Sequence, residues 1–416
     1  MKYLLFLILF SIHFSGIGQE VFRDQNFDPD IKTAYLFPAN DPKGSNIHAA
    51  VVPLSQNVPL VLTFDEVNTD EAAYYYATII HCNADWTKSG LNDMEYLYDF
   101  NEYFIEEYAF SINTKIPYTQ FKFRLPRVKV PGNYIIKVYP EEQPDNPILT
   151  RRFVVYDRKV GVLPKFERSS GISERITNHQ INFKINYGSF PILNPHMDVK
   201  VVIRQNFRWD NAIEGLKPTF VRTDINELEY RYFDLQNNFF AGNEYRFFDL
   251  RSILYSGQNV AQITEHQGMY QATLYTDIPK GKEAYAVFND YNGGYIIENS
   301  DRSGDYLEAD YIQVHFNLRM DQPLSEDIYL AGALTGYKFD KSTKMTYNKE
   351  AKTYQNSLLL KQGWYDYIYY VPNHAKNPYI IEGSHFETRN NYDIIIYYSH
   401  PQLRADIVIG YWKGSN

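Results

Sequence analysis

The feature that most constrains the fold of this chain is a period-two alternation of apolar and polar residues, which recurs along most of its length. Segments such as PLVLTFDEV (59–67) and GNYIIKVYP (132–140) alternate in this way and are bounded by turn-forming residues. Successive side chains of a β-strand point to opposite faces, so this alternation indicates strands. Helical spacing is scarce, apart from a short turn at 92–98 that Asn92 can cap and Glu95 can close. The sequence therefore predicts an all-β fold.

The predicted strands fall into three groups, which indicate tandem immunoglobulin-like β-sandwich domains. Further strands are predicted at 74–83, 120–125, 150–157, 181–188, 198–206, 228–235, 243–250, 269–277, 283–290, 310–318, 325–334, 352–360, 363–371, 390–399 and 405–412. We expect a signal peptide at 1–18, an N-terminal sandwich at 19–157, a middle sandwich at 158–309 and a C-terminal sandwich at 310–416.

The first 18 residues have the layout of a secretory signal peptide. Lys2 precedes an apolar run from Tyr3 to Phe14, small residues follow, and cleavage is expected between Gly18 and Gln19. The run is shorter than the roughly 20 residues of a membrane-spanning helix, and no other apolar stretch approaches that length. We expect a soluble, exported protein that does not itself span a membrane.

Composition limits the partners and the chemistry of the chain. The net charge is −9 and no long basic run occurs, which argues against nucleic acid as a partner. A single cysteine excludes an internal disulfide, so the fold must depend on hydrophobic cores. The 38 tyrosines suit sheet surfaces, and they also suit contact surfaces where aromatic anchors dominate.

No compact catalytic or metal-binding motif occurs in the sequence. The chain lacks G-x-S-x-G, a phosphate-binding glycine-rich loop ending in GK, and H-E-x-x-H. The segment NDYNGGYIIEN (289–299) lacks the alternating acids and the terminal glutamate of a calcium loop. We expect no enzyme activity, no catalytic residues, no cofactor, no metal and no small-molecule substrate. A hydrolase with carboxylates brought together from distant loops is an alternative.

The stretch HCNADW (81–86) contains the single cysteine, Cys82, beside His81. Neighbouring residues of a strand point to opposite faces, so these two side chains cannot share a metal ion or act as a nucleophile and its base. We expect Cys82 to be buried and the residues after it to form a tight turn. Trp86 is expected to pack on the sheet edge, with an anchor for a partner as the alternative.

Two further segments combine arginine with carboxylates at strand ends: QNFRWDNAI (205–213) and EYRFFDLRS (244–252). The residues concerned are Arg208, Trp209, Asp210, Arg246, Asp249 and Arg251. A guanidinium matches a carboxylate or phosphate, so such groups can clamp a ligand. They can also tie strand ends to loops through hydrogen bonds.

The C-terminal segment DIYLAGALTGYKF (327–339) is followed by a strand with a repeated tyrosine pattern. The pattern is formed by Gly363, Tyr365, Tyr367 and Tyr369. This part resembles the glycogen- and starch-binding modules of the early-set immunoglobulin-like class. Those modules stack sugars on tryptophan, whereas this chain has Tyr337 and Phe339 at the first position and no tryptophan in 371–379. A periplasmic carbohydrate-binding protein that uses this module, with Trp364 and Tyr337, is the alternative function.

Five segments spread over nearly the whole mature chain occur in the order seen in one family. They are HCNADW (81–86), QNFRWDNAI (205–213), FFAGNEYRFFDLRS (239–252), ADYIQVHFNL (309–318) and ADIVIGYW (405–412). The chain thereby resembles the plug protein of the type IX secretion system, although Phe207 and Tyr337 depart from the residues common in that family. The resemblance implies a non-enzymatic periplasmic protein that binds the periplasmic mouth of a large outer-membrane β-barrel translocon and closes it between substrates.

Overall fold

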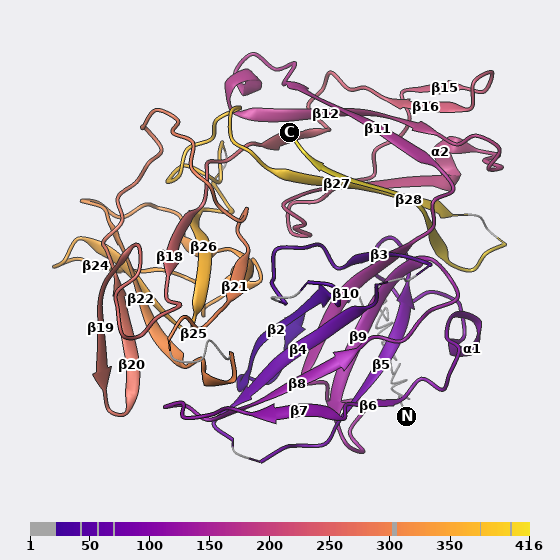
Figure 1. Ribbon diagram of the computed structural model, residues 1–416. Helices are drawn as coiled ribbons and strands as arrows, with labels where there is room; N and C mark the ends of the chain where they lie inside the picture. Colours follow the sequence, from indigo (N-terminus) through magenta and orange to yellow (C-terminus); the bar gives the residue numbers. More distant parts are fainter. Residues whose placement is uncertain are drawn as a thin grey trace, which may run out of the picture.

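The computed structural model of the chain describes residues 22–41, 44–55, 58–69, 71–301, 306–374, 376–399 and 402–416. The signal peptide predicted at 1–18 lies outside these residues. Nearly all of the regular structure is β-strand, and the sheets pack in pairs as three β-sandwiches (Figure 1). The all-β prediction is confirmed. No helix in the described part of the chain is long and apolar enough to cross a membrane.

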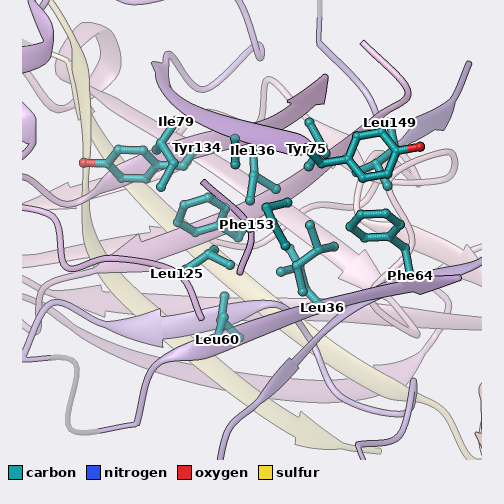
Figure 2. Packing of buried hydrophobic residues seen from close by; sticks show 14 of the residues in the cluster. Leu36, Leu60, Phe64, Tyr75, Ile79, Leu125, Tyr134, Ile136, Leu149 and Phe153 are labelled. Atoms are coloured by element: carbon teal, nitrogen blue, oxygen red, sulfur yellow. The ribbon is translucent and has the colours of Figure 1, made fainter. Parts of the chain in front are cut away.

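Sandwich 1 is formed by the indigo and purple strands of Figure 1. Its strands are β1 (Gln25–Asn26), β2 (Ile31–Pro38), β3 (Val51–Pro53), β4 (Leu60–Val67), β5 (Tyr75–Cys82), β6 (Tyr103–Phe104), β7 (Glu107–Phe110), β8 (Tyr118–Arg124), β9 (Gly132–Pro140) and β10 (Leu149–Tyr156). One sheet has the order β1-β10-β9-β5-β6, with β3 on β10, and the other β2-β4-β8-β7. Figure 2 shows their shared core, with Leu36 and Phe64 from one sheet and Phe153 from the other. The predicted helical turn is α1 (Asp93–Tyr96), where Glu95 accepts the Asn92 N–H at 2.7 Å.

Sandwich 2 combines strands from the middle and from the end of the chain. They are β11 (Gly161–Arg168), β12 (Asn178–Asn186), β13 (Val199–Gln205), β14 (Ile213–Glu214), β15 (Phe220–Arg222), β16 (Glu227–Tyr230), β17 (Asn238–Phe240), β27 (Asn391–Ser399) and β28 (Asp406–Ser415). One sheet has the order β11-β12-β16-β15, with β17 on β12, and the other β14-β13-β27-β28. Two short helices, η1 (Glu174–Ile176) and α2 (Pro195–Asp198), lie between its strands.

Sandwich 3 is formed by the strands between β17 and β27. They are β18 (Arg246–Asp249), β19 (Val260–His266), β20 (Met269–Leu274), β21 (Tyr295–Ile297), β22 (Tyr311–Arg319), β23 (Tyr329–Ala331), β24 (Thr346–Asn348), β25 (Thr353–Lys361) and β26 (Gly363–Tyr370). One sheet has the order β18-β26-β21, with β23 on β26, and the other β19-β20-β22-β25-β24. The short helices η2 (Tyr306–Glu308) and η3 (Ala333–Thr335) connect them.

The sheets do not follow the linear division into 158–309 and 310–416. Strand β27 pairs with β13 along its whole length, from Tyr398 opposite Val199 to Tyr392 opposite Gln205. Strands β18 to β21 belong instead with β22 to β26. Sandwich 3 is therefore inserted into sandwich 2, and in Figure 1 the yellow C-terminal strands lie with the magenta ones. The physical reason is that β13 and β27 are buried almost throughout, so each needs the other's backbone and side chains.

Most of the predicted strands are present, although 228–235, 243–250 and 325–334 contain only short ones. The prediction of a strand at 283–290 is wrong, because this segment has no regular structure. Strands β2, β11 and β19 were missed, as were several strands of two to four residues. A register shift between Lys32 and Tyr35 interrupts the alternation of β2, and Pro164 interrupts that of β11.

A buried ion pair joins sandwiches 1 and 3. Lys361 Nζ on β25 lies 2.8 Å from Asp65 Oδ2 on β4, and the two side chains are 0% and 1% exposed. Tyr311 OH donates to the same carboxylate at 2.8 Å, and the Lys361 ammonium lies 3.9 Å from the centroid of the Tyr118 ring. Partners on every side of these charges offset the cost of removing them from water.

Candidate functional site

His81 and Cys82 lie on opposite faces of β5, as predicted. His81 packs against Tyr96 and Tyr134 inside sandwich 1, while Cys82 belongs to an apolar cluster between sandwiches 1 and 2. Burial lowers the pKa of His81 to about 4 and raises the pKa of Cys82 to about 12. At neutral pH the imidazole is uncharged and the thiol is protonated, so this pair has no reactive character.

Trp86 forms part of the joint between sandwiches 1 and 2. It ends a tight turn, in which its N–H donates to Asn83 O at 2.9 Å, and only 2% of the side chain is exposed. Its ring lies edge-on to that of Trp209, with the centroids 4.8 Å apart. The Arg152 guanidinium lies 4.4 Å from the Trp86 ring and 5.4 Å from that of Trp209. The segments 81–86 and 205–213 therefore meet, and Trp86 is not an exposed anchor.

A second contact between these sandwiches is centred on Asp406, in the signature segment ADIVIGYW. Its Oδ2 accepts the Ala84 N–H at 2.9 Å and the Lys200 ammonium at 2.9 Å. Tyr397 OH donates to Asn133 Oδ1 at 2.9 Å close by. Three of the segments singled out in the sequence thus lie at one joint. Sequence reasoning did not predict this, because each segment has only a local pattern.

Arg208 is a tie between sandwiches 2 and 3. Asp210 accepts two hydrogen bonds from its guanidinium, at 3.0 and 2.6 Å. The remaining Nη1 donates to Tyr379 OH at 3.0 Å, and the guanidinium lies 4.2 Å from the centroid of the Tyr337 ring. Every hydrogen-bonding edge of the Arg208 guanidinium is occupied. Arg208 therefore fits the interpretation of a residue that ties loops together better than that of a residue that clamps a ligand.

Arg246 and Arg251 also make structural ion pairs. Arg246 is paired with Glu382 at 2.9 Å and with Asp277 at 2.6 Å, both from distant loops. Arg251 is paired with Asp249 at 2.7 Å. The sequence grouped Arg246 and Arg251 with Asp249. In the structure only Arg251 pairs with Asp249.

The residues needed by a carbohydrate site are engaged in packing. Trp364 stacks on Phe247, with centroids 4.4 Å apart and ring planes 12° apart. Its Nε1 donates to Asp366 at 3.1 Å. Tyr337 is hydrogen-bonded through its hydroxyl to Tyr245 OH at 3.1 Å. The tyrosines of the predicted strand pattern, Tyr365, Tyr367 and Tyr369, are in the core of sandwich 3. This arrangement gives the carbohydrate alternative no support.

A buried carboxylate, Asp366, and a half-buried one, Asp290, organise the loop at 289–294. Asp366 accepts the N–H groups of Tyr291 at 2.5 Å and Gly293 at 3.3 Å, and Asp290 accepts the Asn292 N–H at 3.0 Å. Burial and the neighbouring acid raise the pKa of Asp366 to about 8, and burial raises the pKa of Asp290 to about 6. Both carboxylates are used by backbone donors, as expected for loop-forming groups. No cluster of three or more potential metal ligands occurs among the described residues.

A central cleft of about 970 Å³ lies where the three sandwiches meet. Sandwich 1 contributes 23–26 and 151–154, sandwich 2 contributes 206–210, and sandwich 3 contributes 291–294 and 333–340. The cleft is therefore the place where the segment 205–213, the loop at 289–294 and the turn that contains Tyr337 come together. Charged side chains line it beside apolar ones, which distinguishes it from the apolar joint between sandwiches 1 and 2.

Residues 31–157, which run from β2 through β10, match the model of the type 9 secretion system plug protein first domain. The chain belongs to the type IX secretion system plug protein family. The crystal structure of a hypothetical protein from Parabacteroides merdae ATCC 43184 is similar to this plug-family chain, with a TM-score of 0.89 and 33% identity. The similarity covers 96% of this chain and 100% of the other, so the arrangement of the three sandwiches recurs in that protein. No curated protein sequence matches this plug-family chain.

Proposed function

We propose that this protein is a non-enzymatic periplasmic plug, which binds the periplasmic opening of the outer-membrane type IX translocon barrel and closes it between substrates. The match of residues 31–157 to the first plug domain carries the proposal. The architecture supports it, because a body that blocks a wide pore must resist deformation. Buried ion pairs and aromatic contacts at the joints between sandwiches give this body its stiffness.

An exposed aromatic edge on sandwich 1 is the surface that we propose contacts the barrel. It comprises Tyr98, Phe100, Phe104, Tyr108 and Phe110, which are 62%, 79%, 40%, 49% and 44% exposed. Strands β6 and β7 are each the last strand of their sheet, so this edge offers both aromatic anchors and strand edges to a partner. A group of exposed aromatic residues this dense is typical of a contact surface.

Recovery of the barrel with a tagged plug tests the partner. We expect the wild-type protein to co-purify with the barrel, and the double variant Phe100→Asp, Tyr108→Asp to lose most of this recovery. Tyr255→Asp is the matched control, because Tyr255 is 77% exposed but lies on sandwich 3. Failure to recover the barrel even after cross-linking contradicts the proposal. Equal recovery with the double variant and the control contradicts only the choice of surface.

Deletion of the gene tests closure of the channel. Cells without the plug are expected to admit large antibiotics that the outer membrane normally excludes, provided that the translocon is present. A strain that lacks both the plug and the barrel is the control and should stay sealed. Unchanged permeability in cells that have the barrel but no plug contradicts closure.

A further inference from the structure

The central cleft defined above is cationic in a protein whose net charge is −9. Its walls include six cationic side chains, Arg23, Arg151, Arg152, Arg204, Arg208 and Lys338, against three acidic ones, Asp24, Asp210 and Asp340. Two of the arginines are already neutralised, because Arg204 is paired with Asp393 and Arg208 with Asp210. Four cations remain, Arg23, Arg151, Arg152 and Lys338, against Asp24 and Asp340, so the lining keeps an excess of two positive charges.

Arg152 presents a free edge to this cleft. Its Nε donates to Phe22 O at 2.9 Å and its Nη2 bonds to the same carbonyl. No described residue accepts a hydrogen bond from Nη1 or forms an ion pair with the guanidinium. The rings of Trp86 and Trp209 hold the group in place. A guanidinium fixed in this way, with one nitrogen free, is prepared to bind an oxyanion.

Arg151 and Lys338 add two charges from different sandwiches. Arg151 points to the opposite face of β10 from Arg152. Its Nε and Nη1 donate to the carbonyls of Ala34, Gln25 and Thr150 at 2.9, 2.9 and 2.7 Å, and its Nη2 donates to Asn26 Oδ1, so Arg151 adds positive charge to the cleft wall while its three nitrogens are engaged. Lys338, on the wall formed by sandwich 3, makes no ion pair with any described residue. Burial, together with the charge of Arg151, lowers the pKa of Lys338. Asp340 and Asp24 partly offset the repulsion between Lys338 and Arg151. A bound anion reduces the repulsion that remains.

We propose that the central cleft is a binding site for a multivalent oxyanion of the polycarboxylate or phosphate class, bound by Arg152 of sandwich 1 and Lys338 of sandwich 3, with the charge of Arg151 adding to the positive field. The volume, about 970 Å³, lies at the upper end of the range for small-molecule sites. A ligand there touches more than one sandwich, so it stiffens the whole body as it binds. This inference does not depend on the proposed closure of the translocon barrel.

Calorimetric titration of the full-length mature protein tests the site. The probes are sodium citrate and sodium pyrophosphate, each titrated at an ionic strength held constant with sodium chloride, so that general screening is removed from the comparison. Citrate binding alone indicates a polycarboxylate ligand, pyrophosphate binding alone indicates a phosphate ligand, and both results support the site. A bound probe is also expected to raise the melting temperature above that in sodium chloride of equal ionic strength.

Variants of one lysine decide where the probe binds. Lys338→Gln is expected to weaken binding about tenfold, the usual effect of losing one charged hydrogen bond, and Lys338→Arg is expected to restore most of it. Lys349→Gln is the matched control, because Lys349 is exposed on the same sandwich and does not line the cleft. The melting temperature of each variant without probe reports whether it folds. Absence of binding for both probes, or a folded Lys338→Gln variant that binds as tightly as the wild type, overturns the proposal.

Discussion

Buried charge pairs hold this protein together, one between sandwiches 1 and 3 and one within sandwich 2. The pairs Asp65–Lys361 and Arg204–Asp393 are almost inaccessible to water, whereas Asp321 and Lys352 are 79% and 58% exposed at a separation of 3.9 Å. An exposed pair contributes little to stability, but removal of one partner of a buried pair leaves an uncompensated charge in the interior. The buried pairs are therefore where single substitutions have large effects.

Asp65→Asn is expected to destabilise the protein by about 3–5 kcal/mol, because it removes the negative charge of the buried Asp65–Lys361 pair between sandwiches 1 and 3. The measurement is the midpoint of urea unfolding, since a chain of three sandwiches need not unfold in two states. Asp321→Asn is the matched control, and a change below about 0.5 kcal/mol is expected for it. Equal midpoints for the two variants would contradict this account of the joint.

His81 makes stability dependent on pH. Burial depresses its pKa from 6.5 to about 4, so the unfolded chain binds a proton in this window that the folded chain does not. The contribution of His81 to the free energy of unfolding is fully present above pH 6.5. It is lost as the pH falls toward 4, by about 3 kcal/mol at most. His81→Phe is expected to reduce the loss of stability between pH 7 and pH 4.5.

Urea midpoints at these two pH values measure the effect as a difference between variant and wild type. Asp366, whose raised pKa acts with the opposite sign, is present in both proteins and cancels in that difference. An unchanged slope in His81→Phe would mean that another group causes the loss at low pH.

The local environment of individual residues could be predicted from the sequence, but their distant partners could not. The opposite orientations of His81 and Cys82 follow from strand alternation, which depends only on neighbouring residues. The contact between Trp86 and Trp209 depends on how two sandwiches pack, and no local pattern records it. The charges around the cleft were missed for the same reason, since Arg152 and Lys338 come from different sandwiches.

At the scale of strands, the sequence predicted elements well and their assignment to sheets poorly. The boundaries of β9 match the predicted segment, because its alternation is regular and turn residues flank it. Strand β27 is apolar almost throughout, which indicates burial on both faces but does not name the neighbouring strand. The pairing of β13 with β27 joins residues nearly 200 positions apart (Val199 with Tyr398), and a linear division of the chain cannot represent it.

This connectivity predicts how fragments behave. A fragment of residues 310–416 is expected not to fold, because it lacks β13, the partner of β27, and β18, the partner of β26. A fragment of residues 158–416 contains all the strands of sandwiches 2 and 3 and is expected to fold. Far-UV circular dichroism and cooperative unfolding in urea distinguish the two. Cooperative unfolding of the shorter fragment would contradict the inserted arrangement.

At the scale of the whole molecule, stiffness depends on the joints between sandwiches. The joint between sandwiches 1 and 2 is an apolar cluster that includes Cys82, Trp86 and Tyr397, and aromatic and cationic groups surround it. Residues of this cluster come from the outer faces of sheets whose inner faces form the sandwich cores. Both faces of these sheets are therefore buried, which makes sandwiches 1 and 2 one body.

Trp209→Ala tests this stiffness directly. The substitution removes the ring that packs against Trp86 and lies between the guanidinium groups of Arg152 and Arg204, at a cost of about 3 kcal/mol. The three cores do not contain Trp209 as a buried member, so each sandwich is expected to stay folded while the joint loosens. Hydrogen exchange is expected to accelerate at residues 82–88 and 199–205 and to stay unchanged within sandwich 3.

Trp364→Ala, which removes a ring stacked on Phe247 in sandwich 3, is the matched control and should show the opposite distribution. If exchange at 82–88 is as slow in Trp209→Ala as in the wild type, the tryptophan joint does not hold these sandwiches together, and the stiffness required of a plug must come from the other contacts between them.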